Sequence, residues 1–147
     1  MKKLLLILLC LPFIGFGQTA QEYFEKAYNS SDDQYKIDNY TKCLRIDPDY
    51  STAYCNRGNV YKELGNYKNA IADYTRAIKI DPDYSTAYYN RGLSYNILEN
   101  YKSAIADYTR AIKIDPDYST AYYNRGLAYN ILENYKSAIA DYTRAIK

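Results

Sequence analysis

The stretch "DPDYSTAYYNRGL" begins at Asp81 and is repeated letter for letter from Asp115. A near copy, "DPDYSTAYCNRGN", begins at Asp47, so the same phrase recurs at a spacing of 34 residues. A fixed period of this length is typical of an array of supersecondary units, each of which packs on its neighbours. The period therefore predicts a repeat architecture for most of the 147-residue chain.

One unit, residues 85–118, contains two segments with helical spacing. Residues of one face fall mostly three or four apart, and they are Tyr88, Gly92, Tyr95 and Leu98, followed by Ala104, Tyr108, Ala111 and Ile112. The segment Glu99–Tyr101 interrupts the pattern, and Pro116 ends the second helix because proline disfavours helical geometry in the residue before it. We expect Asp83 or Ser85 to cap the first helix. Each unit is thus predicted to be helix, turn, helix, turn.

These positions resemble the tetratricopeptide repeat family, whose pattern is an aromatic residue, Leu-Gly, Tyr, Ala, an aromatic residue, Ala and Pro. The matching residues are Tyr54, Gly58, Tyr61, Ala70, Tyr74, Ala77 and Pro82; then Tyr88, Gly92, Tyr95, Ala104, Tyr108, Ala111 and Pro116; then Tyr122, Gly126, Tyr129, Ala138, Tyr142 and Ala145. The resemblance implies an all-α fold, a right-handed α-solenoid of helix–turn–helix repeats. Its three 34-residue units are residues 51–84, 85–118 and 119–147, the last truncated at its C-terminal end.

One departure from the family pattern recurs in every full unit. Arg57, Arg91 and Arg125 stand where the family usually has leucine. An arginine stem can pack against apolar neighbours while its head reaches solvent, so we expect the substitution to be mild. The glycine that follows each arginine lies in mid-helix, where glycine costs about 1 kcal/mol relative to alanine, and it is expected to let the partner helix approach closely.

Residues 18–50 form a degenerate N-terminal unit. "YTKCLRIDPDY" from Tyr40 parallels "YTRAIKIDPDY" from Tyr74, so the second helix keeps its register. In the first helix strict spacing would put Phe24 at the glycine position, whereas a three-residue deletion puts Ala27 there and Tyr23 at the aromatic position. We prefer the deletion, with residues 29–33 as the turn. An atypical first repeat is expected of a terminal cap.

Residues 1–17 have the layout of a secretory signal peptide: Lys2 and Lys3, an apolar run to Phe16, then Gly15 and Gly17 two apart. We predict cleavage between Gly17 and Gln18 and export to the periplasm, the envelope or the medium. The alternatives are a membrane anchor, which needs about 20 apolar residues, and a buried helix. Lipidation at Cys10 is disfavoured by the bulky Leu9 before it. The mature chain is then expected to have no membrane span.

Two cysteines, Cys43 and Cys55, remain after that cleavage. We expect both to be small buried side chains, with a disulfide between them as the alternative. Their spacing matches neither a CxxC redox pair nor a metal site.

The composition gives no sign of nucleic-acid binding, catalysis or a cofactor. Without residues 1–17, which contain two of the 19 basic residues, 17 basic residues balance 17 acidic ones, and no basic cluster is present. The sequence has no histidine, which excludes His-dependent triads and histidine metal sites. The carboxylates of the "DPD" segments could bind calcium, but we interpret them as turn and cap residues because calcium loops need a denser set of oxygens.

The resemblance implies that the first helices of successive units line a concave groove for extended or helical peptide segments. Carried over position by position, the residues that we call the groove set are Thr52, Asn56, Asn59 and Lys62, with Cys55 and Glu63; Thr86, Tyr89, Asn90, Leu93, Asn96 and Ile97; and Thr120, Tyr123, Asn124, Leu127, Asn130 and Ile131. Asparagines can pair with a peptide backbone, and the Tyr–Leu–Ile sets offer apolar pockets. The lysine positions of the family's clamp for acidic chaperone C-termini hold Cys55, Thr120 and Asn124, so that clamp is missing.

The predicted function is a non-enzymatic scaffold that binds a protein or peptide of unidentified sequence in the exported compartment. The alternatives are a structural self-assembly unit and the N-terminal fragment of a longer exported or membrane protein. Self-association is suggested by the final helix, residues 136–147, on which Ala145 and Ile146 should present an uncovered apolar side.

Overall fold

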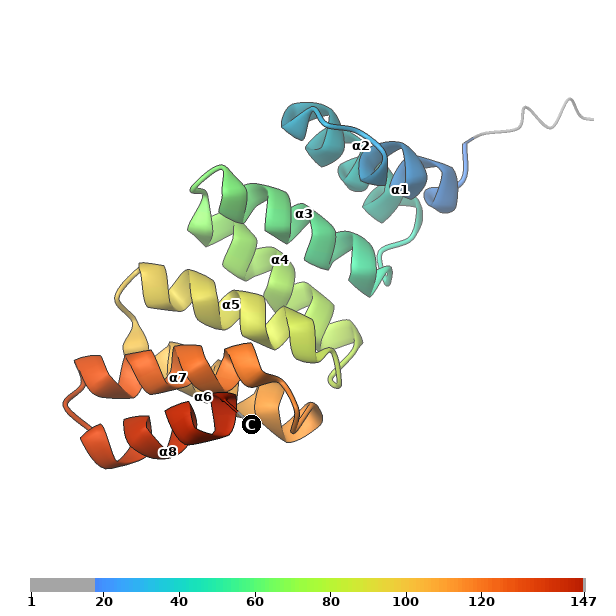
Figure 1. The fold of residues 1–147 in the computed structure, drawn as a ribbon. Helices are drawn as coiled ribbons and strands as arrows, with labels where there is room; N and C mark the ends of the chain where they lie inside the picture. The colour runs from blue at the N-terminus through green and yellow to red at the C-terminus, as the bar shows by residue number, and fades with distance from the viewer. Residues whose placement is uncertain (1–17, 147) are drawn as a thin grey trace, which may run out of the picture.

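The computed structural model describes residues 18–146, so the predicted signal peptide and its cleavage site lie outside the described residues. The described part consists of eight α-helices and contains no strand. These are α1 (Ala20–Tyr28), α2 (Asp33–Ile46), α3 (Ser51–Glu63), α4 (Tyr67–Ile80), α5 (Ser85–Ile97), α6 (Tyr101–Ile114), α7 (Ser119–Ile131) and α8 (Tyr135–Ala145). Consecutive helices pack as pairs, and the pairs stack in chain order into an elongated array (Figure 1). The prediction of an all-α solenoid is confirmed.

The helices begin with different caps from those expected. The N-cap of α5 is Tyr84, whose side chain makes no capping hydrogen bond, and the same holds for Tyr50 before α3 and Tyr118 before α7. The Asp81 carboxylate instead accepts a bond from the N–H of Asp83, at 3.1 Å, and stabilises the turn. The prediction that Asp83 or Ser85 caps α5 is therefore wrong.

The core is built from the small and aromatic residues of the repeated pattern. Ala70, Tyr74 and Ala77 of α4 are fully buried, and their counterparts in α6 are equally buried. A Cβ atom on Gly92 would lie 2.8 Å from the Tyr108 ring, so these two helices are in contact only because glycine has no side chain.

The first repeat follows the register with the three-residue deletion. Ala27 is fully buried in the cluster that contains Tyr40. The Lys26 ammonium lies 5.6 Å from the centre of the Tyr23 ring, as the Arg57 guanidinium lies 5.7 Å from that of Tyr54. Tyr23, Lys26 and Ala27 thus correspond to the Tyr, Arg and Gly of the full units.

The two cysteines are free, buried and placed in different clusters of the core. Cys43 packs with the first repeat, and Cys55 packs with α4 and α5. Burial raises the pKa of the Cys43 thiol to about 11, and burial also raises the pKa of Cys55. Both are therefore neutral packing residues near pH 7.

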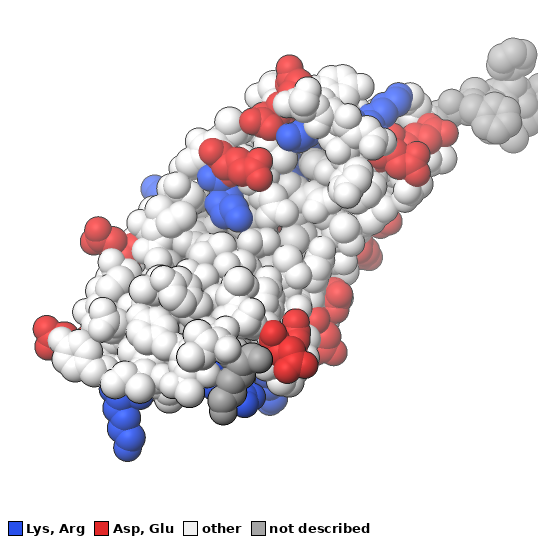
Figure 2. Space-filling view, in the orientation of Figure 1, with Lys and Arg blue, Asp and Glu red and all other residues white. Residues whose placement is uncertain are grey.

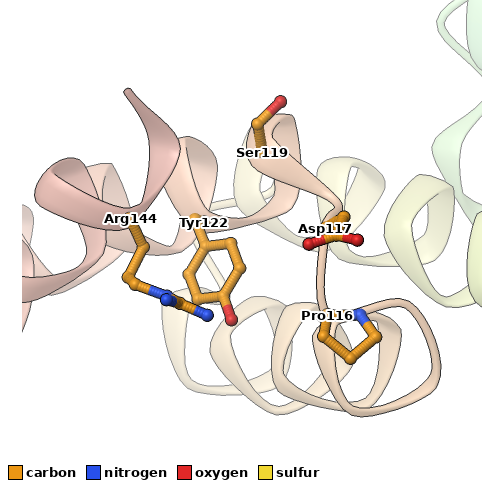
Figure 3. Close-up of a pocket in the computed structure, with 5 residues that line it drawn as sticks. All are labelled: Pro116, Asp117, Ser119, Tyr122 and Arg144. Atoms are coloured by element: carbon orange, nitrogen blue, oxygen red, sulfur yellow. The ribbon is translucent and has the colours of Figure 1, made fainter. Parts of the chain in front are cut away.

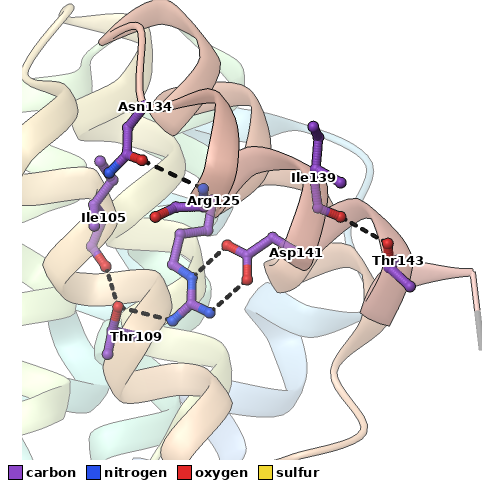
Figure 4. Close-up of polar contacts among 8 residues, drawn as sticks. Ile105, Thr109, Arg125, Asn134, Ile139, Asp141 and Thr143 are labelled. Atoms are coloured by element: carbon purple, nitrogen blue, oxygen red, sulfur yellow. Dashed lines mark hydrogen bonds and ion pairs between the residues drawn. The ribbon is translucent and has the colours of Figure 1, made fainter.

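The arginine heads do not reach solvent as expected. Arg125 donates two hydrogen bonds to Asp141 of its own repeat, both 2.7 Å, and a third to the Thr109 hydroxyl of the preceding repeat, at 3.0 Å (Figure 4). The same geometry recurs at two earlier sets, Arg57 with Asp73 and Thr41, and Arg91 with Asp107 and Thr75. We call each set an arginine link.

Each arginine link joins three helices. Burial by itself would lower the pKa of Arg57, but the bonds to Asp73 outweigh burial, and the pKa is raised. The expectation of a mild, solvent-directed substitution is wrong, because an aspartate 16 residues downstream pairs with each of these three guanidinium groups.

Candidate functional site

The groove set lies on the first helices of the three full repeats, α3, α5 and α7, which face the viewer in Figure 1. Figure 2 shows that the charged side chains on this side of the molecule lie mainly over α1 and α3 and along the edges. The groove set itself has the same asymmetry, since Lys62 and Glu63 of α3 are its only charged members. The surface over α5 and α7 is uncharged.

The members of the groove set differ in exposure. Those exposed are Glu63, Thr86, Ile97, Thr120, Tyr123, Asn130 and Ile131, those half-buried are Thr52, Asn56, Asn59, Lys62, Tyr89, Leu93, Asn96, Asn124 and Leu127, and Cys55 and Asn90 are buried. The most accessible apolar side chains are Tyr123, 51% exposed, and Ile97 and Ile131, both 50% exposed. These three can contact a ligand without any rearrangement of the fold.

A closed polar network joins α3 to α5. The Tyr74 hydroxyl donates to Asn59 Oδ1, at 2.8 Å, and the Asn90 amide donates to the same oxygen, at 3.1 Å. Lys62 Nζ donates to Asn90 Oδ1, at 3.3 Å. Both polar ends of the Asn90 amide are thus engaged inside the protein, which gives this residue a stabilising role in the structure.

The corresponding network between α5 and α7 is open. Leu93 stands in the place of Asn59 and has no polar atom to offer Tyr108, the counterpart of Tyr74. Asn124 turns instead toward α5 and its own helix, donating to the Tyr89 hydroxyl at 3.1 Å and to the Thr120 carbonyl at 2.9 Å. Among the residues that the structure describes, the Tyr108 hydroxyl and Asn96 Oδ1 are buried without a hydrogen-bond partner.

Tyr108 was absent from the groove set because the family pattern assigns its position to the core. It is fully buried, and its ring lies 5.9 Å from that of Tyr89, a groove residue. Burial raises its pKa, so the hydroxyl stays protonated and can donate near pH 7. The change from Asn59 to Leu93 was the signal in the sequence that could have revealed the difference between the two networks.

One hollow of the described surface lies away from the groove. It has a volume of about 410 Å³ and is lined by Pro116, Asp117, Ser119, Tyr122 and Arg144 (Figure 3). Its basic group is already engaged, because the Arg144 guanidinium stacks 5.6 Å from the centre of the Tyr122 ring. Residues 18–146 contain no group of three or more His, Cys, Asp or Glu that could hold a metal ion. No helix among them is both long enough and apolar enough to span a membrane.

Comparison with known families gives consistent matches. Models described as tetratricopeptide repeats match residues 39–72 and, as successive units, residues 85–118 and 119–147, and a model described as a TPR repeat matches residues 58–96. A search of curated proteins gives no significant match.

Several solved structures share the fold. A crystal structure of MamA protein is 26% identical with a TM-score of 0.82, and the match covers 86% of this chain and 71% of that one. A tetratricopeptide repeat protein from Parabacteroides merdae ATCC 43184 is 27% identical with a TM-score of 0.80, covering 87% of this chain and 52% of that one. The second TPR of Spaghetti (RPAP3), bound to the HSP90 peptide SRMEEVD, is 32% identical with a TM-score of 0.64, covering 65% of this chain and 89% of that one.

Proposed function

This chain belongs to the tetratricopeptide repeat family, and from that premise we propose that it is a non-enzymatic scaffold that binds a peptide segment in the groove along α3, α5 and α7. The observation that carries the proposal is that three half-exposed apolar side chains, Tyr123, Ile97 and Ile131, lie on α5 and α7, whose groove residues are all uncharged. Isolated exposed apolar side chains are common, but several of them on neighbouring helices with no charged groove residue are typical of an interaction site. The peptide-bound structure of a similar repeat domain supports the same use of the fold.

The ligand proposed here differs from the peptide in that structure. The sequence SRMEEVD contains three acidic residues, which need basic partners. The groove set has one basic residue, Lys62, and this residue is half-buried and already bonded to Asn90. We therefore propose a partner whose bound segment is not acidic.

The experiment is a selection of phage-displayed dodecapeptides against residues 18–147, followed by titration calorimetry with the tightest synthetic peptide. Replacing both Tyr123 and Ile131 by serine should weaken binding at least about tenfold, since each half-exposed apolar side chain supplies about 1 kcal/mol. Leu64→Ser is the matched control, because Leu64 is 55% exposed and lies outside the groove set. Failure to select any peptide, or equal affinities for all three proteins, would contradict the proposal.

The compartment is a separate part of the proposal. The lysine–apolar–glycine layout of residues 1–17 supports export with cleavage after Gly17. Intact-mass measurement of the protein from the envelope fraction should give a chain that starts at Gln18. Recovery of the full-length chain with Met1 from the membrane would contradict it.

Self-association is a second candidate, and three exposed apolar side chains within residues 135–146 favour it. Tyr135 is 58% exposed, Ile139 is 65% exposed and Ile146 is 85% exposed. Of their counterparts one repeat earlier, Tyr101 and Ile105 are half-buried, and Ile112, the counterpart of Ile146, is only 9% exposed and packs in the cluster that contains Ala121 of α7. Ala145, which we expected on the same open side, is half-buried.

We expect light scattering over a concentration series to show self-association of residues 18–147. Ile139→Lys with Ile146→Lys should abolish it, whereas lysine at the exposed Leu64 should leave it unchanged. If the wild-type chain stays monomeric and α8 is as protected from hydrogen exchange as α6, this surface does not drive assembly.

A further inference from the structure

Two junctions of the groove have the same helix geometry but different polar chemistry. Between α3 and α5, one asparagine oxygen accepts hydrogen bonds from Tyr74 and Asn90, and Lys62 bonds to Asn90. The α5–α7 junction has Leu93 in place of that asparagine and Asn96 in place of that lysine. The tyrosine of the second junction, Tyr108, is consequently buried with an unused hydroxyl.

An unpartnered buried hydroxyl and an unpartnered buried carboxamide oxygen are costly to a fold, because each has lost its hydrogen bonds to water. Asn96 Oδ1 needs a donor, and the Tyr108 hydroxyl, which stays protonated, can donate to an acceptor. A peptide group supplies both, one N–H and one C=O. In the first junction the counterpart of Tyr108 bonds to the residue at the position of Leu93, and Asn96 lies three residues after Leu93 on the same helix, so both groups belong to the same part of the groove.

The surroundings of the two atoms restrict the ligand further. Every groove residue of α5 and α7 is uncharged, and those of α5 include the apolar or aromatic Tyr89, Leu93 and Ile97. A charged side chain inserted there would lose its hydration without gaining a partner. An apolar side chain would lose only unfavourable contact with water.

We infer that the α5–α7 junction is the primary subsite of the groove, where an uncharged segment of a peptide ligand pairs one main-chain amide with Asn96 and Tyr108 and packs an apolar side chain against Leu93. The inference rests on the proposed peptide-binding function. Because both polar atoms are buried, the inference requires the half-buried Leu93 side chain to turn aside when the ligand carbonyl approaches the hydroxyl. The α3–α5 junction, whose polar atoms already bond to one another, contributes only surface contacts.

The test exchanges the two junctions. Leu93→Asn should give Tyr108 the acceptor that Asn59 gives Tyr74, raise the melting temperature by roughly 3 °C and weaken the selected dodecapeptide about tenfold. The matched variant, Asn59→Leu, should lower the melting temperature by roughly 3 °C, because it leaves Tyr74 without its acceptor. Tyr108→Phe is a second variant with little risk to the fold, and it should weaken binding about fivefold without lowering the melting temperature.

The outcomes separate the inference from the function on which it rests. Binding that Tyr123→Ser with Ile131→Ser weakens, but that Leu93→Asn and Tyr108→Phe leave intact, would overturn the subsite while the groove function stands. Selected peptides rich in acidic or basic residues would overturn the ligand class. Binding insensitive to every groove substitution would overturn both proposals.

Discussion

In the first repeat, α1 begins with a capping box, in which the Thr19 hydroxyl accepts from the N–H of Glu22 and the Glu22 carboxylate accepts from the N–H of Thr19. The first helices of the later repeats, α3, α5 and α7, have tyrosine N-caps whose side chains make no capping bond. The buried Arg–Asp pair of the later repeats is also replaced, by the exposed Lys26 and by Asn39.

The difference shows two ways of stabilising one helical pair. In the later repeats, an arginine on the first helix bonds to an aspartate on the second helix of the same repeat and to a threonine of the preceding repeat. The first repeat satisfies the start of its helix locally, and Phe24 stacks 5.0 Å from the Tyr50 ring in place of a charged link. The first repeat is thus stabilised by a local cap. Residues 18–146 include no preceding repeat with which it could form an arginine link.

Breaking an arginine link should give the largest effect. Asp107→Ala leaves Arg91, whose side chain is 17% exposed, without its carboxylate partner, and we expect a loss of about 3 kcal/mol in the free energy of unfolding. The counterpart in the first repeat is Asn39→Ala, which removes one bond to the Tyr35 carbonyl and should cost about 1 kcal/mol. Urea unfolding measures both, and equal losses would show that the link is not what distinguishes the repeats.

The glycine position should give the next effect. Gly92→Ala places a methyl group 2.8 Å from the Tyr108 ring, and overpacking of about 1–3 kcal/mol should exceed the gain of about 1 kcal/mol in helix propensity. The first repeat already has alanine there, so Ala27→Gly should cost only about 1 kcal/mol through propensity. Thermal unfolding compares the two, and a Gly92→Ala variant more stable than wild type would contradict the close packing.

Much of the fold could be predicted from the sequence because its signal is local and repeated. The spacing from Tyr88 to Leu98 and from Ala104 to Ile112 predicted two helices, and α5 and α6 are found there. The arginine link was missed because its partners lie 16 residues apart on different helices. Comparison among repeats contained the clue, since arginine and aspartate are present together in three units and absent together from the first.

The groove set shows a second limit of position-by-position transfer. A family position says which way a residue points, but not whether its neighbours already use its polar atoms. Asn90 and Asn124 occupy equivalent positions, yet the amide of the first is enclosed by Asn59 and Lys62, and the second bonds to Tyr89. Only the three-dimensional structure gives these partners.

Removing the local cap should have a smaller effect, confined to one end. Thr19→Ala deletes the side chain of the capping box and should destabilise α1 by about 1 kcal/mol, seen as faster hydrogen exchange over residues 20–28. Ser85→Ala is the control in a later repeat, where the serine caps nothing, and exchange in α5 should stay the same. Faster exchange throughout the chain after Thr19→Ala would mean that α1 also supports the later repeats.

The smallest expected difference can be measured without any mutation, because each kind of repeat has its own buried thiol. Burial raises the pKa of Cys43 to about 11, and that of Cys55 is also raised, so at pH 8 neither thiol is appreciably ionised in the folded chain. Alkylation must pass through opened states in which both thiols regain an ordinary pKa of about 8.5. The relative labelling rates therefore report the free energies of the two openings.

Cys43 becomes accessible when the first repeat alone opens, whereas Cys55 packs with α4 and α5 and requires later repeats to separate. Opening the first repeat breaks only the Arg57–Thr41 bond of the first arginine link, whereas separating Cys55 on α3 from α4 also breaks the Arg57–Asp73 ion pair, so Cys43 should react about threefold faster with iodoacetamide, a difference somewhat under 1 kcal/mol. In urea, where no repeat persists, the two rates should become equal. Faster reaction of Cys55 in the folded chain would reverse the comparison, because it would show that the locally capped first repeat is held more firmly than the linked ones.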